Sequence, residues 1–180
     1  MSLKRKFLTL MGWEAPLTTI STGNTAPGFT LKSLDGKDYS LANLLEKGPV
    51  VAAFFKISCP VCQFTLPFIQ RLAERYAGDT AAILSISQDD AKSTAAFNKE
   101  YGLSLPTLLD DSGYPVSNAY GLSMVPTIFL IEPDGKVKVS SMGFDKADLE
   151  KIGGVLSTRR KLAAAPLFRA DEVVPDSKPG

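Results

Sequence analysis

The chain has 180 residues, with 20 lysines and arginines against 19 acidic residues and a formal net charge of +1. This length suits one domain with a substantial core, and the balanced charge gives no electrostatic reason to expect nucleic acid or a membrane surface as a partner. The sequence has no histidine and only two cysteines, which excludes histidine general-base chemistry and a four-cysteine zinc site within one chain. We therefore expect neither a metal nor another cofactor.

The N-terminal segment carries a basic cluster, Lys4 to Lys6, followed by a short apolar stretch from Phe7 to Trp13. The stretch is interrupted by Thr9 and Gly12 and has no small-residue cleavage site, so it matches a signal peptide only in part. We expect a cytoplasmic protein, or a periplasmic or other extracytoplasmic one if this segment is an atypical or truncated signal. No stretch approaches the roughly 20 apolar residues of a membrane span.

Prolines, glycines and turn-forming pairs set the expected boundaries. Residues 1–25 are predicted to form an irregular N-terminal arm, residues 26–162 the domain, and the Pro-rich residues 163–180 an irregular C-terminal tail. Near the start of the domain, Asp35-Gly36 stands between FTLKSL and KDYSL and predicts a β-hairpin.

Buried strands then alternate with helices. Val50 to Phe55 is a continuous apolar run, typical of a strand covered on both faces, and Ala81 to Ile86 has the same character. Between them a helix is predicted from Pro60 to about Gly78, with a kink at Pro67. This order predicts an α/β fold with a mixed central sheet and helices on both faces. The other predicted elements are a helical turn at 41–45, a helix at 90–101, a strand in PTLLDD, a helix at 114–120, the strand TIFLI, the exposed strand KVKVS after a hairpin turn, and a helix at 146–162.

Both cysteines fall where the first buried strand gives way to its helix, in FFKISCPVCQF. Cys59 would occupy the helix N-terminus, where free backbone N–H groups and the helix dipole stabilise a thiolate. Cys62 would lie one turn on, close enough to attack a mixed disulfide formed at Cys59. The intervening Pro60 and Val61 help to set the reduction potential. Lys56 would stabilise the thiolate further if its ammonium points towards the sulfur.

Two other interpretations of the cysteine pair are half of a metal site and a pair of inert core residues. The absence of histidine counts against the metal site. The C-P-x-C spacing at a strand-to-helix junction, within a strand-helix-strand pattern, counts against inert core residues. The residues therefore favour a redox-active pair.

Two longer segments stand out together, APGFTLKSLDGKDYSLANLLEKGPVVAAFFKISCPVC and YGLSMVPTIFLIEPDGKV. They resemble the thioredoxin-like superfamily, and within it the TlpA-like and redoxin (AhpC/TSA-related) branch of thiol-disulfide oxidoreductases. The resemblance covers about residues 26–154. It implies a thioredoxin-like fold with an N-terminal hairpin extension, a Cys59 that attacks, a Cys62 that resolves, and a redox-active Cys59-Cys62 disulfide.

The resemblance also implies that Pro126, in Val125-Pro126-Thr127, is a cis-proline beside the disulfide. From the residues alone, an ordinary trans proline that opens the following strand is the expectation. The cis-proline loop that the resemblance implies would leave the backbone of Val125 free to pair with a bound substrate peptide. The expected partners are a disulfide-containing protein or small molecule and an unidentified thiol electron donor.

The chain departs from the family pattern near the motif. Ala53 stands where thioredoxins carry a buried acid, and Thr65 stands where TlpA-like reductases often have a glutamate. Ser58 replaces the common tryptophan before the motif. Cys62 therefore lacks its usual proton acceptor at both acidic positions.

Two alternative functions stay open. A peroxiredoxin-like thiol peroxidase shares this fold, but its motif has a threonine or serine and a proline where this chain has Lys56 and Ala52, and its arginine is replaced by Pro126. The other alternative is a non-catalytic redox-sensing or binding module on a thioredoxin scaffold. We predict a thiol-disulfide oxidoreductase that acts mainly as a reductase, because a cytoplasm keeps such pairs as dithiols.

Overall fold

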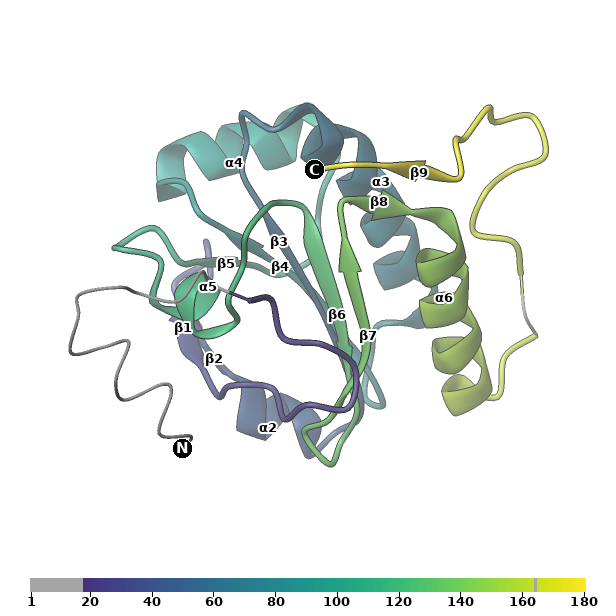
Figure 1. Cartoon of the computed structure of the whole chain (residues 1–180), viewed down its shortest axis with the longest axis horizontal. Coiled ribbons are helices and arrows are strands. Elements are labelled where there is room, and N and C mark those ends of the chain that lie inside the picture. Colours follow the sequence, from purple (N-terminus) through teal and green to yellow (C-terminus); the bar gives the residue numbers. More distant parts are fainter. Residues whose placement is uncertain (1–17, 164) are drawn as a thin grey trace.

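The structure is a computed structural model that describes residues 18–163 and 165–180. The N-terminal segment that matches a signal peptide in part lies outside these residues. Five strands form a central sheet in the order β5-β4-β3-β6-β7 (Figure 1). These strands are β3 (Val50–Phe55), β4 (Ala82–Ser87), β5 (Thr107–Leu109), β6 (Thr127–Ile131) and β7 (Val137–Met142).

The sheet is mixed, as predicted from the order of the elements. β3, β4 and β5 run parallel to one another, whereas β6 runs antiparallel to both β3 and β7. A parallel pair needs a crossover, and the helix that begins with the cysteines supplies it between β3 and β4. β7 lies at the edge and alternates buried with less buried side chains, which explains its lysine-containing sequence.

Helices cover both faces of the sheet, and β3 shows why. Its side chains alternate between two core clusters, and all six are fully buried. Val51, Ala53 and Phe55 pack in the cluster that contains α3 and α6, whereas the other three strand residues pack in the cluster that contains α2 and α5. These helices are α3 (Pro60–Tyr76) and α6 (Lys146–Arg160) on one face and α2 (Leu41–Leu45) and α5 (Pro115–Ala119) on the other, and the remaining described helix is α4 (Ala91–Glu100). α3 is continuous through Pro67.

Two smaller sheets complete the fold. β1 (Thr30–Lys32) and β2 (Asp38–Ser40) form the antiparallel hairpin predicted at Asp35-Gly36, where Gly36 has a φ of +80°. β8 (Phe144–Asp145) pairs with β9 (Ser177–Lys178) near the end of the chain.

The C-terminal segment has more structure than its proline content suggested. It ends in β9, and Leu167 and Phe168 are buried in the same core cluster as α3 and α6. The Phe168 ring lies 4.9 Å from the ring of Phe68, centroid to centroid. Burial of these two apolar side chains holds the segment against the domain, because apolar area removed from water is stabilising. The boundaries at residues 25 and 162 stay predictions.

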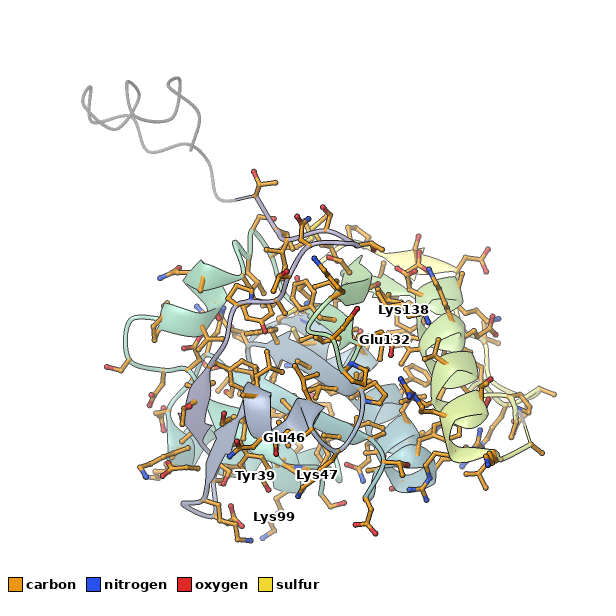
Figure 2. The ribbon with its side chains drawn as sticks, turned by 90° about the horizontal axis from the view of Figure 1, so that it is seen from below. Tyr39, Glu46, Lys47, Lys99, Glu132 and Lys138 are labelled. Atoms are coloured by element: carbon orange, nitrogen blue, oxygen red, sulfur yellow. The ribbon has the colours of Figure 1, made fainter. Side chains whose placement is uncertain are left out.

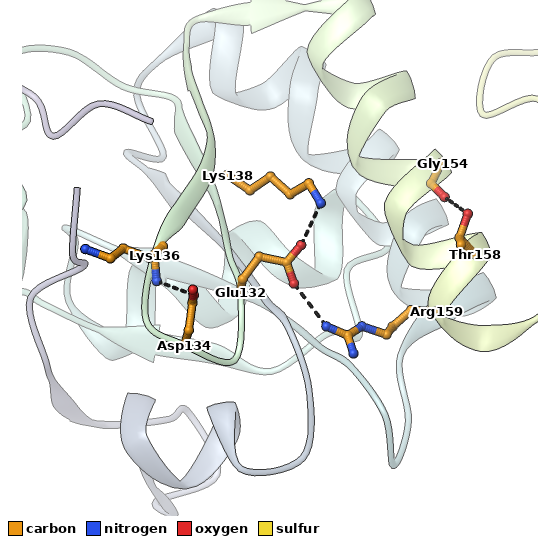
Figure 3. A network of polar contacts seen from close by, with 7 residues as sticks. All are labelled: Glu132, Asp134, Lys136, Lys138, Gly154, Thr158 and Arg159. Atoms are coloured by element: carbon orange, nitrogen blue, oxygen red, sulfur yellow. Dashed lines mark hydrogen bonds and ion pairs between the residues drawn. The ribbon is translucent and has the colours of Figure 1, made fainter. Parts of the chain in front are cut away.

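Charged side chains gather at the end of the sheet where β6 finishes. Figure 2 shows this side of the molecule, with Glu132 and Lys138 close together. Glu132 accepts hydrogen bonds from Lys138 Nζ (2.9 Å) and from an Arg159 guanidinium nitrogen (3.2 Å), as Figure 3 shows. In the same view Asp134 accepts a hydrogen bond from the backbone N–H of Lys136 and closes the hairpin turn. Within the described residues, no helix has the length and apolar character to cross a membrane.

Candidate active site

The strand register brings three loops to the opposite end of the sheet. Because β3 and β6 are antiparallel, Phe54 at the end of β3 pairs with Thr127 at the start of β6. Because β3 and β4 are parallel, Phe55 pairs with Ser87 at the end of β4. The loops that follow β3, precede β6 and follow β4 therefore meet at one edge, and the cysteines lie there.

Cys59 is the N-cap residue of α3. Its backbone is extended (φ −86°, ψ 114°), and its sulfur accepts a hydrogen bond from the backbone N–H of Cys62 at 3.1 Å. The sulfur therefore takes the place of the side-chain oxygen of an ordinary N-cap, where the helix dipole favours negative charge. Cys59 is half-buried, and both cysteines are free thiols. This is a suitable environment for an attacking thiolate.

Cys62 has the opposite environment. Its side chain is completely buried beneath the first turn of α3. Burial raises the pKa of the Cys62 thiol above its ordinary value, and a hydrogen bond with Cys59 raises it further. Cys62 is therefore held as a protonated thiol that a substrate does not reach first.

The loop before β6 faces Cys59. The Val125-Pro126 peptide bond is cis, and the carbonyl oxygen of Val125 accepts a hydrogen bond from the Cys59 thiol at 3.3 Å. Two hydrogen bonds hold this loop. Thr127 Oγ1 donates to the carbonyl of Met124 at 2.8 Å, and the backbone N–H of Gly143 donates to the carbonyl of Pro126 at 2.7 Å.

The other predicted site residues take more varied positions. Pro60 is exposed in the first turn of α3, and Val61 is half-buried with its carbonyl accepting a hydrogen bond from Thr65 Oγ1 at 2.6 Å. Lys56 Nζ lies 5.4 Å from the centroid of the Tyr114 ring, a cation–π distance. The site therefore brings together both cysteines and the cis-proline loop, while the Lys56 ammonium lies over an aromatic ring.

Asp89 is a site residue that the sequence did not reveal, because an aspartate at this position is typical of a turn or a helix cap. Its Oδ2 accepts a hydrogen bond from the backbone N–H of Ile57 at 2.8 Å. Gln63 Nε2, from α3, donates to the carbonyl of the same Ile57 at 2.9 Å. These two hydrogen bonds fix the backbone N–H and the backbone carbonyl of Ile57, which lies two positions before Cys59. One signal was available, since Asp89 lies two residues after the end of β4, a buried parallel strand next to β3.

The described residues contain no group of three or more histidine, cysteine, aspartate or glutamate side chains that could hold a metal ion.

Comparison with known proteins places the chain in a family. Residues 22–140 match the AhpC/TSA family. The chain belongs to this family. It is 34% identical over 122 residues to the thiol-disulfide oxidoreductase ResA of Geobacillus thermodenitrificans, which covers 67% of this chain and 69% of that protein.

Solved structures confirm the predicted thioredoxin-like fold. The thioredoxin domain of a thiol-disulfide oxidoreductase from Bacteroides vulgatus superposes with a TM-score of 0.67 at 22% identity, covering 77% of this chain and 99% of that one. A secreted Mycobacterium tuberculosis disulfide oxidoreductase homologous to E. coli DsbE gives a TM-score of 0.60 at 21% identity, covering 72% and 95%.

These relatives confirm one prediction and overturn another. The predicted enzyme class, a thioredoxin-like thiol-disulfide oxidoreductase, is confirmed. The predicted cytoplasmic location is wrong, because it is contradicted by the ResA- and DsbE-like relatives, one of which is a secreted protein. The incomplete match of the N-terminal segment to a signal peptide was too weak a basis for that prediction.

Proposed function

We propose that Cys59 and Cys62 are the dithiol/disulfide couple of this oxidoreductase, with Cys59 as the nucleophile and Cys62 as the resolving thiol. The observation that carries the proposal is the contrast between them. The Cys59 sulfur is half-buried at a helix N-terminus, whereas the Cys62 sulfur is fully buried directly behind it. A substrate meets Cys59 first, and only a mixed disulfide at Cys59 comes within reach of Cys62.

The proposed reaction has two exchange steps. The Cys59 thiolate attacks one sulfur of a substrate disulfide, so that a mixed disulfide forms and the other substrate sulfur leaves as a thiolate and takes a proton. Cys62 then gives up its proton to the second departing sulfur and attacks the sulfur of Cys59. The substrate gains two electrons and two protons, and the protein is left with a Cys59-Cys62 disulfide. A thiol electron donor, which the sequence does not identify, then reduces this disulfide back to the dithiol.

Backbone groups support a protein disulfide as the substrate. The Val125 carbonyl lies beside Cys59, and the loop that carries it is held from behind by the Thr127 hydroxyl. An extended substrate segment would align beside this loop through main-chain hydrogen bonds, which tolerate many sequences. The direction of exchange depends on the reduction potential of the couple. Because the cytoplasmic location is wrong, a reducing cytoplasm gives no reason to expect the reductase direction.

Reduction of insulin disulfides by dithiothreitol tests the proposal. We expect the wild-type protein to accelerate the reaction and Cys59→Ser to abolish the acceleration. Catalysis that survives in Cys59→Ser, or a wild-type protein that oxidises reversibly without any turnover, would contradict it. The second result would favour the redox-sensing module.

A further inference from the structure

The last residues of the chain lie along the edge of the candidate active site. Ser177 and Lys178 of β9 pair with Asp145 and Phe144 of β8, and the backbone N–H of Lys146 donates to the carbonyl of Asp176 at 2.9 Å. Figure 1 shows the C-terminal end beside β8 and the cysteine end of α3. We call residues 176–180 the strap.

The strap reaches the loop that contacts Cys59. A Cβ atom added at Gly180 would lie 2.5 Å from the carbonyl oxygen of Val125 and 3.4 Å from the sulfur of Met124. A Cβ atom added at Gly143, which has a φ of +76°, would lie 2.4 Å from the carbonyl oxygen of Lys178. Glycine at these positions permits the backbones to approach so closely. The strap therefore lies against the same carbonyl that accepts the Cys59 hydrogen bond.

A side chain of the strap also covers part of the site. Lys178 Nζ lies 4.5 Å from the centroid of the Phe64 ring. Phe64 belongs to α3, two residues after Cys62, and its ring packs edge-on against Phe144 of β8 at 4.9 Å. The lysine thus lies over an aromatic surface that α3 and β8 form together.

The strap is held less firmly than the segment before it. Ser177, Lys178 and the two residues that follow are exposed, whereas Leu167 and Phe168 are buried and Glu172 forms an ion pair with Arg71. Val173, between these two parts, is fully exposed. The strap therefore has fewer buried contacts with the domain than the segment around Phe168.

We propose that the strap occupies the docking place of an extended polypeptide, so that a protein client displaces it by pairing with β8 and the Val125 loop. This inference rests on the proposed function. Cys59 is half-buried with the strap in place, so small disulfides and thiols reach its sulfur without displacing the strap. The strap therefore competes with polypeptide clients and leaves the reactions of small disulfides and thiols at Cys59 unaffected.

Two variants and a matched control test the strap. Lys178→Pro removes a main-chain N–H from the strand pair, and Lys178→Ala removes only the contact with Phe64. Lys138→Ala is the control, since Lys138 contacts Glu132 at the other end of the sheet. The probe is insulin B chain with its cysteines carboxymethylated, an extended peptide that cannot exchange disulfides. Binding affinity and amide hydrogen exchange of residues 176–178 are measured for each protein.

We expect the peptide to raise amide exchange in the wild-type strap. We expect Lys178→Pro to bind the peptide about fivefold more tightly and Lys178→Ala about twofold, which are the sizes expected for a lost ladder hydrogen bond and an exposed cation–π contact. Iodoacetamide should alkylate Cys59 at the same rate in all of them. Equal peptide affinity in wild type and Lys178→Pro, or strap exchange that the peptide leaves unchanged, overturns the inference. Failure of the proposed function appears separately, as no mixed disulfide between the Cys62→Ser variant and intact insulin although the peptide still displaces the strap.

Discussion

The sulfur of Cys59 lies 3.3 Å from the carbonyl oxygen of Val125, a residue 66 positions later in the chain. The antiparallel pairing of β3 with β6 creates this contact, because it sets the end of one strand beside the start of the other. A reactive thiol and a main-chain acceptor thus share one edge of the sheet. Attack and alignment of a substrate take place within one small region.

Replacement of the resolving thiol should trap clients. Cys62→Ser leaves Cys59 able to attack but removes the group that releases the mixed disulfide. We expect a stable adduct with insulin at Cys59, visible by mass spectrometry without reductant, and none with Cys59→Ser. An adduct that forms equally with both variants, or with neither, would count against the assigned roles.

The stability of the reduced protein should fall in mildly alkaline solution. Burial, and then the hydrogen bond with Cys59, raise the pKa of Cys62, so the folded protein keeps a proton that the unfolded chain loses above pH about 8.5. The contribution is complete below that pH. Above it, the free energy of unfolding falls by up to about 1.4 kcal/mol per pH unit.

Urea unfolding between pH 7.5 and about 10 measures this slope. In the Cys62→Ala variant, the free energy of unfolding should not show this fall with pH. Burial also raises the pKa of Tyr120, which matters only above its ordinary value of about 10 and therefore outside this window. Parallel pH profiles for wild type and Cys62→Ala would show that the fold does not hold the Cys62 proton.

Asp89 should act as a positioning residue for the loop before Cys59. Asp89→Ala removes the acceptor of the Ile57 N–H and should cost about 1–3 kcal/mol of stability and slow insulin reduction. Asp89→Asn keeps an oxygen acceptor for the Ile57 N–H and should retain most of the stability and most of the rate of insulin reduction. The charge of Asp89 also adds to the raised pKa of Cys62, after burial and the Cys59 hydrogen bond. Asp89→Asn should therefore shift the pH profile of the resolving step to lower pH.

The neighbouring Asp90 provides the control for that experiment. Its carboxylate caps α4 by accepting from the backbone N–H of Ser93 at 2.9 Å. Asp90→Ala should cost about 1 kcal/mol of stability through the lost cap and leave the pH profile of exchange unchanged. If Asp89→Asn leaves that profile unchanged as well, the role of Asp89 is structural only.

The C-terminal segment should loosen in acid. Hydrogen bonds from Arg71 lower the pKa of Glu172 from 4.5 to about 2. A lowered carboxyl pKa contributes stability that is complete above the ordinary value and is lost as the pH falls towards the folded value. The protection factors of the amides of residues 167–172, which correct for the intrinsic pH dependence of exchange, should therefore fall between pH 4.5 and 2.

Two variants check the assignment to this ion pair. Glu172→Gln should show the faster exchange already at neutral pH and little further change in acid. Asp38→Asn, which breaks the exposed ion pair with Lys32 in the hairpin, should leave the C-terminal segment unchanged. Acid loosening of equal size in Glu172→Gln and wild type would assign the effect to another group.

Local sequence signals predicted most of the fold. Val50 to Phe55 is apolar without alternation because both of its faces are buried, and Asp35-Gly36 marks a hairpin through backbone preference alone. The C-P-x-C motif likewise predicted a cysteine at a helix N-terminus. Each of these features depends on residues close together in the chain, which is why it could be read from a single sequence.

Features that depend on distant partners could not be predicted in this way. The contact of Asp89 with Ile57 arises from strand register, and the pairing of β9 with β8 arises from burial of Leu167 and Phe168 elsewhere in the segment. The position of the Lys56 ammonium over Tyr114 depends on a loop more than 50 residues away. The proline content predicted an irregular C-terminal tail, because composition reflects only the backbone preference of a segment. It does not indicate which surface of the domain the segment packs against.

Redox titration against glutathione, followed by mass mapping of the thiols, decides whether Cys59 and Cys62 act as one couple. A Cys59-Cys62 couple predicts one two-electron transition in which both thiols disappear together and no glutathione remains bound. Two independent one-thiol reactions that leave glutathione on Cys59, or a Cys62 that stays reduced throughout, would contradict it.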